Sequence, residues 1–297
     1  MAINTTNFDE ALRPGINKWY GAEYADHPEI YSKIFDVKNS TQMSEYSMSM
    51  AAFGLVPVKA QGQPISYADT QQGYKNTLTH ISYALGFPVT YEMAKFNQYG
   101  IVELLSRSLA KSVRQTIETI DANHLNNAFS SSYVGADGKE LCATDHPKLY
   151  GGTWQNEPTT AADFSMTSWE QARIDIGSFV DDRGLKIAAN IKQAIFPIEL
   201  ESSAAQLFGS EKDPESNFNA INPFYNKTKY ITNPYLTDPD AWFVQTDVMN
   251  GLVHYWADKP KFERNNDSDS KNAKYSTFFI FTSGWNDPRN IYGSPGA

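Results

Sequence analysis

Asp145 and His146 are adjacent in the sequence, a few positions after Cys142 and the serines at 130–132. A thiol or hydroxyl nucleophile, an imidazole base and a carboxylate are the side chains that nucleophilic catalysis needs. A catalytic triad depends on geometry, however, and neighbouring residues in a chain usually point apart. The pattern therefore favours a loop aspartate and a loop histidine. A soluble hydrolase that uses this region is the weaker alternative.

A second group with chemical potential is Asp267-x-Asp269, which resembles the first ligands of a calcium loop. The pattern then fails, because Lys271 stands where a ligand belongs and no closing Glu follows. The five histidines show no metal-ligand spacing, and the sequence contains no phosphate-binding, dinucleotide-binding or zinc-protease motif. We therefore expect no catalytic residue, metal or cofactor, and so no enzyme.

Composition excludes several classes of protein. Of the 297 residues, 41% are hydrophobic and 13% aromatic, which is too apolar for a disordered chain. A single cysteine rules out a disulfide framework and fits a reducing compartment. The start lacks the features of a secretion signal, and no apolar run approaches the ~20 residues of a membrane span. A net charge of −9 without a basic stripe argues against sequence-specific nucleic-acid binding. We expect a soluble intracellular protein without a membrane partner.

The clearest predicted element is a long helix over residues 98–129. Apolar residues recur there at steps of three and four, which is the period of one helix face. Charged residues follow the same steps on another face: Glu103, Arg107, Lys111, Arg114, Glu118 and Asp121. A helix of this length is longer than a small compact domain is wide, so it indicates an elongated subunit.

Residues 45–90 predict a long hairpin of low charge. Strand-like stretches run over Ser47–Val58 and Tyr74–Leu85, and Gly62 and Pro64 mark the turn-rich stretch between them. A two-stranded hairpin is marginal in water by itself, and edges with few charges invite pairing. This hairpin must therefore lie on its own domain or on a neighbouring molecule.

Residues 1–36 predict an irregular arm, because no helical or strand period runs through their spaced aromatic residues. Such side chains need a surface to pack against. Packing onto the chain's own core is favoured on these grounds alone.

The rest of the chain predicts a mixed α and β unit. Thr167 and Glu170 form a capping-box pattern before a helix with Trp169, Ala172, Ile176 and Phe179 on one face. A strand at 192–196 and a short helix ending near Gly209 follow. Further strands are expected around 229–231, 241–246 and 252–256, and a last hairpin at 259–283.

Several long stretches, which cover most of the chain in order, carry a resemblance to a known family. The stretches are FGLVPVKAQGQPISY…QQGY at 53–74, SVRQTIETIDANHLNNAFSSSY at 112–133, DGKELCATDHP at 137–147, DIGSFVDDRGLKIA at 175–188, YLTDPDAWFVQTDVMNGL at 235–252, and NDSDSKNAKY at 266–275 followed by SGWNDPRNIYGSPGA at 283–297. They resemble a tailed-bacteriophage major capsid protein of the Hong Kong 97-like fold, in the branch of the Mu-like prophage major head subunits.

The resemblance implies an α+β subunit with a role for each segment. The implied segments are an N-arm at 1–36, an E-loop hairpin at 37–90, a peripheral domain at 91–149 with a spine helix at 98–129, an axial domain at 150–254, and return strands of the peripheral domain at 255–297 with a hairpin tip at 264–272. The implied assembly residues are Trp19, Tyr20, Tyr24, Lys59, Tyr67, Tyr74, Asp267 and Asp269.

The implied function is a head subunit that self-assembles into pentamers and hexamers of an icosahedral shell around double-stranded DNA. The virion would be its location, after assembly in the cytoplasm of the bacterial host. A separate scaffold or protease, a portal and decoration proteins would be its partners. The arm begins at Met1, so scaffolding is expected from another protein, and nothing indicates a crosslink at Lys59 or Lys75. An encapsulin-like compartment is the alternative within the same fold.

Overall fold

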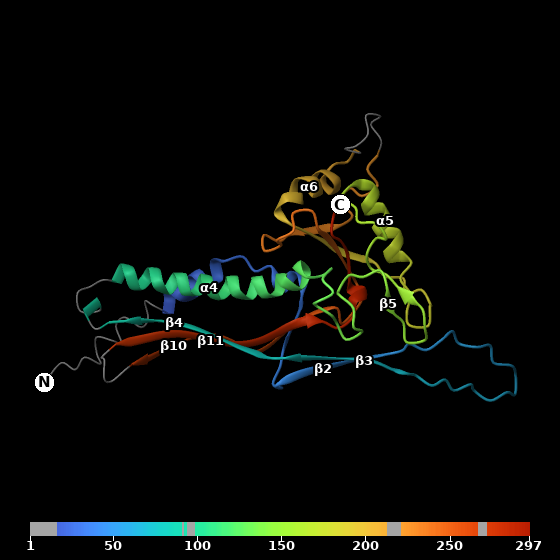
Figure 1. Ribbon diagram of the computed structural model, residues 1–297, viewed down its shortest axis with the longest axis horizontal. Coiled ribbons are helices and arrows are strands. Elements are labelled where there is room, and N and C mark those ends of the chain that lie inside the picture. The colour runs from blue at the N-terminus through green and yellow to red at the C-terminus, as the bar shows by residue number, and fades with distance from the viewer. Residues whose placement is uncertain (1–16, 91, 94–98, 213–220, 267–271) are drawn as a thin grey trace.

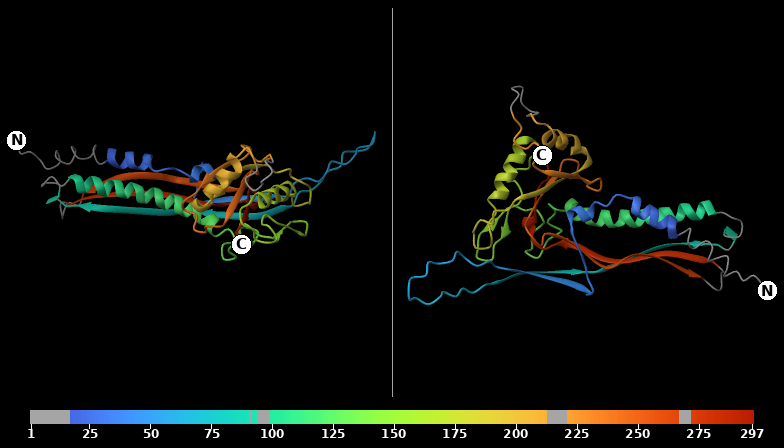
Figure 2. Two further views of the ribbon diagram at one scale, coloured as in Figure 1. Left: turned by 90° about the horizontal axis from the view of Figure 1, so that it is seen from above. Right: turned by 180° about the vertical axis from the view of Figure 1, so that it is seen from behind.

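The computed structural model describes residues 17–90, 92–93, 99–212, 221–266 and 272–297. An elongated body of one long helix on a sheet carries a second helix-and-sheet unit near one end (Figure 1). A narrow ribbon passes below this second unit and extends beyond it (Figure 2). The predicted elongated α+β subunit is therefore confirmed.

The first sheet has the strand order β1–β10–β11–β4. Its strands are β1 (Asp36–Asn39), β10 (Leu252–Asn266), β11 (Ala273–Trp285) and β4 (Ile81–Val89), and helix α4 (Tyr99–Asn126) lies along it (Figure 1). Strands β10 and β11 form one long hairpin, so the strand predicted at 252–256 is continuous with the first strand of the hairpin predicted at 259–283. The predicted helix is confirmed close to its expected ends, with Val113, Ile117 and Leu125 buried against the sheet.

Three residues of the charged face predicted for this helix are not exposed to solvent. Arg114, Glu118 and Asp121 are buried, although they follow the spacing of the exposed charges. Residues 17–26 are helical and α2 (Tyr31–Ile34) follows, and these segments lie beside α4 (Figure 2). The expectation of an irregular arm before residue 36 is therefore wrong for residues 17–26 and 31–34, which are helical. Its residues 1–16 lie outside the described part of the chain.

The predicted hairpin exists, but its strands are shorter than expected. Strand β2 (Ser44–Met50) pairs antiparallel with β3 (Gln72–Thr79), and the chain then bends at His80 into β4 of the first sheet. The strand expected at Ser47–Val58 therefore continues past the end of β2, and the strand expected at Tyr74–Leu85 spans parts of both β3 and β4. We call residues 51–71, which have no regular structure, the distal loop.

The second unit is built on the sheet β12–β9–β7–β8. Its elements are α5 (Met166–Gly177), β7 (Ile191–Phe196), the turn η1 (Ile198–Leu200), α6 (Glu201–Gly209), β8 (Lys229–Thr232), β9 (Trp242–Thr246), the turn η2 (Pro288–Asn290) and β12 (Ile291–Ser294). The expected apolar face of α5 is confirmed, because Trp169, Ala172 and Ile176 are buried. The helix begins two residues earlier than expected. Ser165 caps it together with Ser168, instead of Thr167 with Glu170.

Strand β12 pairs antiparallel with β9 in the second sheet. It lies within residues 255–297, all of which were expected in the peripheral domain. The chain therefore returns to the second unit after completing the β10–β11 hairpin. A small hairpin of β5 (His146–Pro147) and β6 (Thr153–Trp154) follows α4 and precedes α5 in the sequence.

Candidate assembly surfaces

The distal loop is closed at its base and at its tip. At the base, the backbone N–H of Ala51 donates to the carbonyl of Gln71 at 3.0 Å, next to the last pair of the β2–β3 ribbon. At the tip, the N–H of Gln63 donates to the carbonyl of Ala60, and Gly62 has a φ of +80°. A positive φ at this turn position suits glycine. The loop is therefore a defined protrusion with a tight turn at its end.

Most large apolar side chains of this protrusion are exposed within the described chain, although Ala51 at its base is buried. Val56 is 93% exposed, Val58 99% and Tyr67 92%. The other large apolar residues exposed on the ribbon and loop are Met43, Tyr46, Met48, Met50, Phe53, Leu55 and Ile65. Large exposed apolar surface marks interaction sites on soluble proteins. Methionines add adaptability, because their unbranched side chains fill irregular gaps.

Two other residues expected in assembly lie on the same hairpin. Lys59 is exposed near the tip, and Tyr74 is half-buried on β3. Burial raises the pKa of Tyr74, and the nearby carboxylates of Asp137 and Asp182 raise it further. Lys59 and Tyr67 thus share the exposed loop, whereas Tyr74 lies on the ribbon and is partly buried.

The aromatic residues expected in the arm pack on their own chain. Tyr20 is 6% exposed and stacks on Phe262 of β10 with ring centroids 4.6 Å apart. Trp19 packs beside Val102 of α4, and Tyr24 lies against the same helix. Burial raises the pKa of Tyr24 to about 12. These three residues therefore do not join Lys59 and Tyr67 in one surface.

Buried charges attach the arm to α4. Backbone N–H groups of Ile30 and Tyr31 donate to the two carboxylate oxygens of Glu118 at 2.9 and 3.0 Å. Arg114 pairs with Glu29 at 3.0 Å, donates to the carbonyl of Tyr24 and lies 4.0 Å above the Tyr24 ring. Charge-assisted bonds of this kind are stronger than neutral ones.

Burial dominates the titration of Glu118. It raises the pKa of this carboxyl to about 7, although the two N–H donors oppose the shift. A second buried acid on α4, Asp121, lies 2.8 Å from Nδ1 of His254. The sequence carries no signal for these roles, because the partners come from segments about 90 or more positions away along the chain.

The Asp145–His146 pair does not form a nucleophilic site. Asp145 faces outward and pairs with Lys139, whereas His146 is fully buried and stacks on Trp154. Both ring nitrogens of His146 are engaged, Nδ1 by Asp137 at 2.7 Å and Nε2 by Asn156 at 3.0 Å. The adjacent residues point apart, as the sequence predicts.

Asn156 and Cys142 both have structural roles in this region. Asn156 Nδ2 donates to the carbonyls of Leu141, Pro288 and Ile291, which ties the 141–156 segment to the chain before and within β12. Cys142 is fully buried, and burial raises the pKa of its thiol well above the usual range. A protonated, enclosed thiol is a poor nucleophile. This region therefore holds the fold together and lacks the geometry of the alternative hydrolase.

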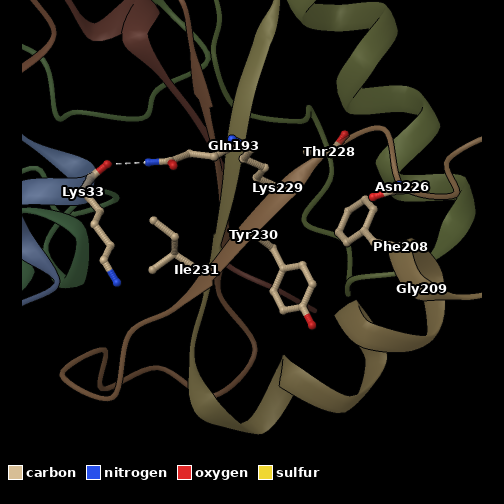
Figure 3. A pocket seen from close by; sticks show the side chains of 9 residues that line it. All are labelled: Lys33, Gln193, Phe208, Gly209, Asn226, Thr228, Lys229, Tyr230 and Ile231. Atoms are coloured by element: carbon tan, nitrogen blue, oxygen red, sulfur yellow. Dashed lines mark hydrogen bonds between the residues drawn. The ribbon is translucent and has the colours of Figure 1, made fainter. Parts of the chain in front are cut away.

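A pocket lies between the end of α2, strands β7 and β8, and the end of α6 (Figure 3). Its cavity volume is about 570 Å³, and Gln193 crosses one side by donating to the carbonyl of Lys33 at 2.8 Å. The lining residues include Lys33 and Lys229 but no carboxylate, so they provide no acid–base pair.

Asp267 and Asp269 lie outside the described residues. Within the described ranges, no three His, Cys, Asp or Glu side chains gather in a way that could hold a metal ion. None of the helices described there is both long and apolar enough to cross a membrane.

The comparisons with known proteins agree with an assembly subunit. The sequence profile of the family described as phage capsid protein matches residues 75–294, which is most of the chain. No curated protein matches the sequence.

Several solved phage structures share the fold at low sequence identity. A chain of the procapsid of bacteriophage JBD30 is 14% identical with a TM-score of 0.54, over 98% of this chain and 76% of that one. A Gordonia phage Cozz chain is 12% identical with a TM-score of 0.53, over 88% and 84%. A chain of the mature capsid of bacteriophage PhiM1 is 12% identical with a TM-score of 0.53, over 90% and 86%.

The expected Hong Kong 97-like fold and capsid function are thereby confirmed, whereas the Mu-like branch stays a prediction. The chain, with its long helix on one sheet, its second sheet unit and its bare apolar protrusion, belongs to the phage capsid protein family and is a major capsid protein.

Proposed function

We propose that this chain assembles head to tail into pentamers and hexamers, and that these close an icosahedral shell around double-stranded DNA. In such a ring each subunit offers one surface to the next copy and accepts the matching surface of the previous copy. The offered surface is the distal loop with its β2–β3 ribbon. The expected axial domain at 150–254, extended by β12, lies around the ring axis in this proposal.

The exposure of the distal loop carries the proposal. Fully burying a Val, Leu, Ile or Phe side chain contributes roughly 1.5–3 kcal/mol relative to leaving it in water. The loop offers Phe53, Leu55, Val56, Val58 and Ile65 for such burial, and all are exposed in the single chain. Ordering the loop against a partner opposes part of that gain. Even so, a neighbouring copy that covers these residues gains enough to account for association.

The loop offers very little charge to a partner. Lys59 and Asp69 are the two charged residues within 51–71, so a partner surface faces few desolvation penalties there. Lys59 and Tyr67 are therefore kept as proposed contacts with the neighbouring copy. For Tyr20, contact with a neighbour is not proposed, because its own chain buries it. Trp19 and Tyr24 are only partly buried and remain proposed contacts.

The acidic balance of the chain fits a container for DNA. A net charge of −9 repels a polyanion and disfavours adhesion of packaged DNA to the wall. The subunit acts by geometry in this proposal and catalyses no reaction. A scaffold or protease, a portal and decoration proteins remain proposed partners, and assembly in the bacterial cytoplasm is proposed before the subunit becomes part of the virion.

The test replaces residues 53–68 by a short Gly/Ser linker. The wild-type chain should form capsomers or shells in negative-stain microscopy and light scattering, with a co-expressed scaffold where one is needed. The loop variant should remain a folded single subunit. Gln61→Ser with Gln63→Ser is the matched control, because it alters the same tip without removing apolar surface. Normal particles from the linker variant would contradict the proposed contact.

A further inference from the structure

The turn at residues 181–185 in the second unit is built around one aspartate. Oδ1 of Asp181 accepts the backbone N–H groups of Arg183 and Leu185, both at 2.8 Å. Its backbone also exchanges bonds with Gly184 and Leu185, and Gly184 has a φ of +82°. This turn is therefore short and internally bonded, which restricts the position of Arg183 at its apex.

A second arginine fixes the turn to the body. Arg289 donates from Nε to the carbonyl of Val180 at 3.0 Å and pairs with Asp182 at 3.1 Å. Its guanidinium lies 4.6 Å from the centre of the Trp154 ring, and its side chain is largely buried. The base of the turn thus rests on η2 and β6, so Arg183 projects from a rigid support.

Arg183 reaches from this support to both limbs of the distal loop. Nε donates to the carbonyl of Ala52 at 2.7 Å, and Nη2 donates to the carbonyl of Asp69 at 3.1 Å. Nη2 also donates to the hydroxyl of Tyr150 at 2.8 Å, and the guanidinium lies 4.4 Å from the Tyr150 ring centre. One side chain therefore joins the start of the distal loop, the end of the distal loop and the turn between β5 and β6.

The chemistry of these contacts suits arginine and no other residue. A guanidinium presents five donors in a planar fork, so it can serve acceptors from separate segments while stacking on an aromatic ring. A lysine ammonium lacks that plane. The loop acceptors are backbone carbonyls, so the contact depends on where the two limbs lie and not on their side chains.

We propose that Arg183 is the positioning residue that fixes the direction in which the distal loop leaves the subunit, and that this direction selects regular shells over irregular aggregates. The part of this inference that concerns regular shells rests on the proposed function. A loop that swings freely meets the next copy at variable angles, and rings close only when the rotation between copies is constant.

The first experiment measures the loop in the free subunit. Spin labels are placed at Lys59→Cys in the loop and Ser202→Cys on α6, because the native Cys142 is buried and unreactive. Double electron–electron resonance then gives the distribution of label distances. Arg183→Ala should broaden that distribution by about twofold or more, because the loop base loses its tie to the body. Arg183→Lys should fall between this variant and the parent.

The matched control is Arg173→Ala, which removes an exposed arginine of the same unit that lies over Phe224 instead of the loop. It should leave the distribution unchanged. Thermal unfolding of all three variants should match the parent, because a surface arginine contributes little to global stability. An unchanged distribution in Arg183→Ala would overturn the positioning role, whether or not the wild-type chain assembles.

The second experiment compares particles without labels. Arg183→Ala should yield mainly irregular or open assemblies under conditions in which the wild type and Arg173→Ala give uniform shells. Uniform shells of normal size from Arg183→Ala, despite a broadened loop, would overturn the link between loop direction and regular closure. Failure of the wild type to assemble would instead contradict the proposed function and leave the distance measurement intact.

Discussion

The arm at residues 17–35 and the distal loop at 51–71 both extend along or away from the body, yet their surfaces differ. Tyr20 and Ile34 of the arm are buried, and Glu118 and Arg114 of α4 bond to its backbone. Val56 and Val58 of the loop are almost fully exposed, and the bonds that fix the loop lie at its base. An aromatic or apolar segment therefore packs on its own chain where buried polar side chains form hydrogen bonds with its backbone. Where they do not, its apolar surface is left for another molecule.

The largest expected change in stability comes from breaking the arm. Tyr20→Ala should lower the free energy of unfolding by about 3–5 kcal/mol, which is the range for removing a buried aromatic ring. The ring is enclosed by Leu109 and Phe262 and leaves a cavity when it is lost. Urea denaturation monitored by circular dichroism measures the change. A loss below about 1 kcal/mol would mean that the arm is not part of the core.

A smaller loss is expected when the charged attachment is removed. Arg114→Met keeps most of the side-chain volume but deletes the ion pair to Glu29 and the bond to the Tyr24 carbonyl. We expect a loss of about 2 kcal/mol in the same denaturation assay, because Glu29 stays partly in contact with water. Arg107→Met is the control, since Arg107 is more exposed and its loss should change stability little. Equal losses in the two variants would contradict the attachment.

The arm should also confer a pH dependence. Folded Glu118 holds its proton up to a pKa of about 7, whereas the unfolded carboxyl releases it near 4.5. The folded state binds more protons in this window, so stability should fall as the pH rises from 4.5 to 7. The contribution is on the order of 2 kcal/mol. Denaturation at pH 5 and pH 8 should show a smaller difference in Glu118→Gln than in the wild type, and identical differences would contradict the assignment.

The smallest change in stability belongs to the distal loop. Replacing Val56, Val58 and Tyr67 together by Ser should alter the free energy of unfolding by no more than about 0.5 kcal/mol for each site, because exposed side chains make few contacts. Assembly should nevertheless be lost in light scattering, since these side chains form the proposed contact. A large loss of stability would show that the loop folds back on its own chain, like the arm.

Much of the scaffold follows from periodic patterns in the sequence. The apolar spacing over 98–129 predicts α4, and Trp169, Ala172 and Ile176 predict the buried face of α5. Such patterns succeed because a single buried face repeats at the period of its own helix. The low charge of 45–90 likewise predicts a hairpin, but it leaves open whether the hairpin lies on its own domain or on a neighbouring molecule.

The contacts that distinguish arm from loop could not be predicted in this way. Glu118 has the spacing of an exposed charge, and its burial depends on N–H groups at residues 30 and 31. Arg183 is one arginine in a polar turn, and its acceptors lie at residues 52 and 69. Each bond joins segments far apart in sequence, and local periodicity carries no information about such pairs.

Strand β12 has a consequence for the timing of folding during synthesis. The second sheet needs Ile291–Ser294 beside β9, and Asn156 bonds to the carbonyl of Ile291. The distal loop ends some 220 positions earlier in the chain. At 5–20 residues per second, a ribosome takes roughly 10–45 s to travel from the end of the loop to β12. Nascent chains on one messenger RNA therefore expose the sticky loop before the unit that holds Arg183 is complete. Because β12 pairs with β9, the second sheet can be completed only after residues 291–294 have been made.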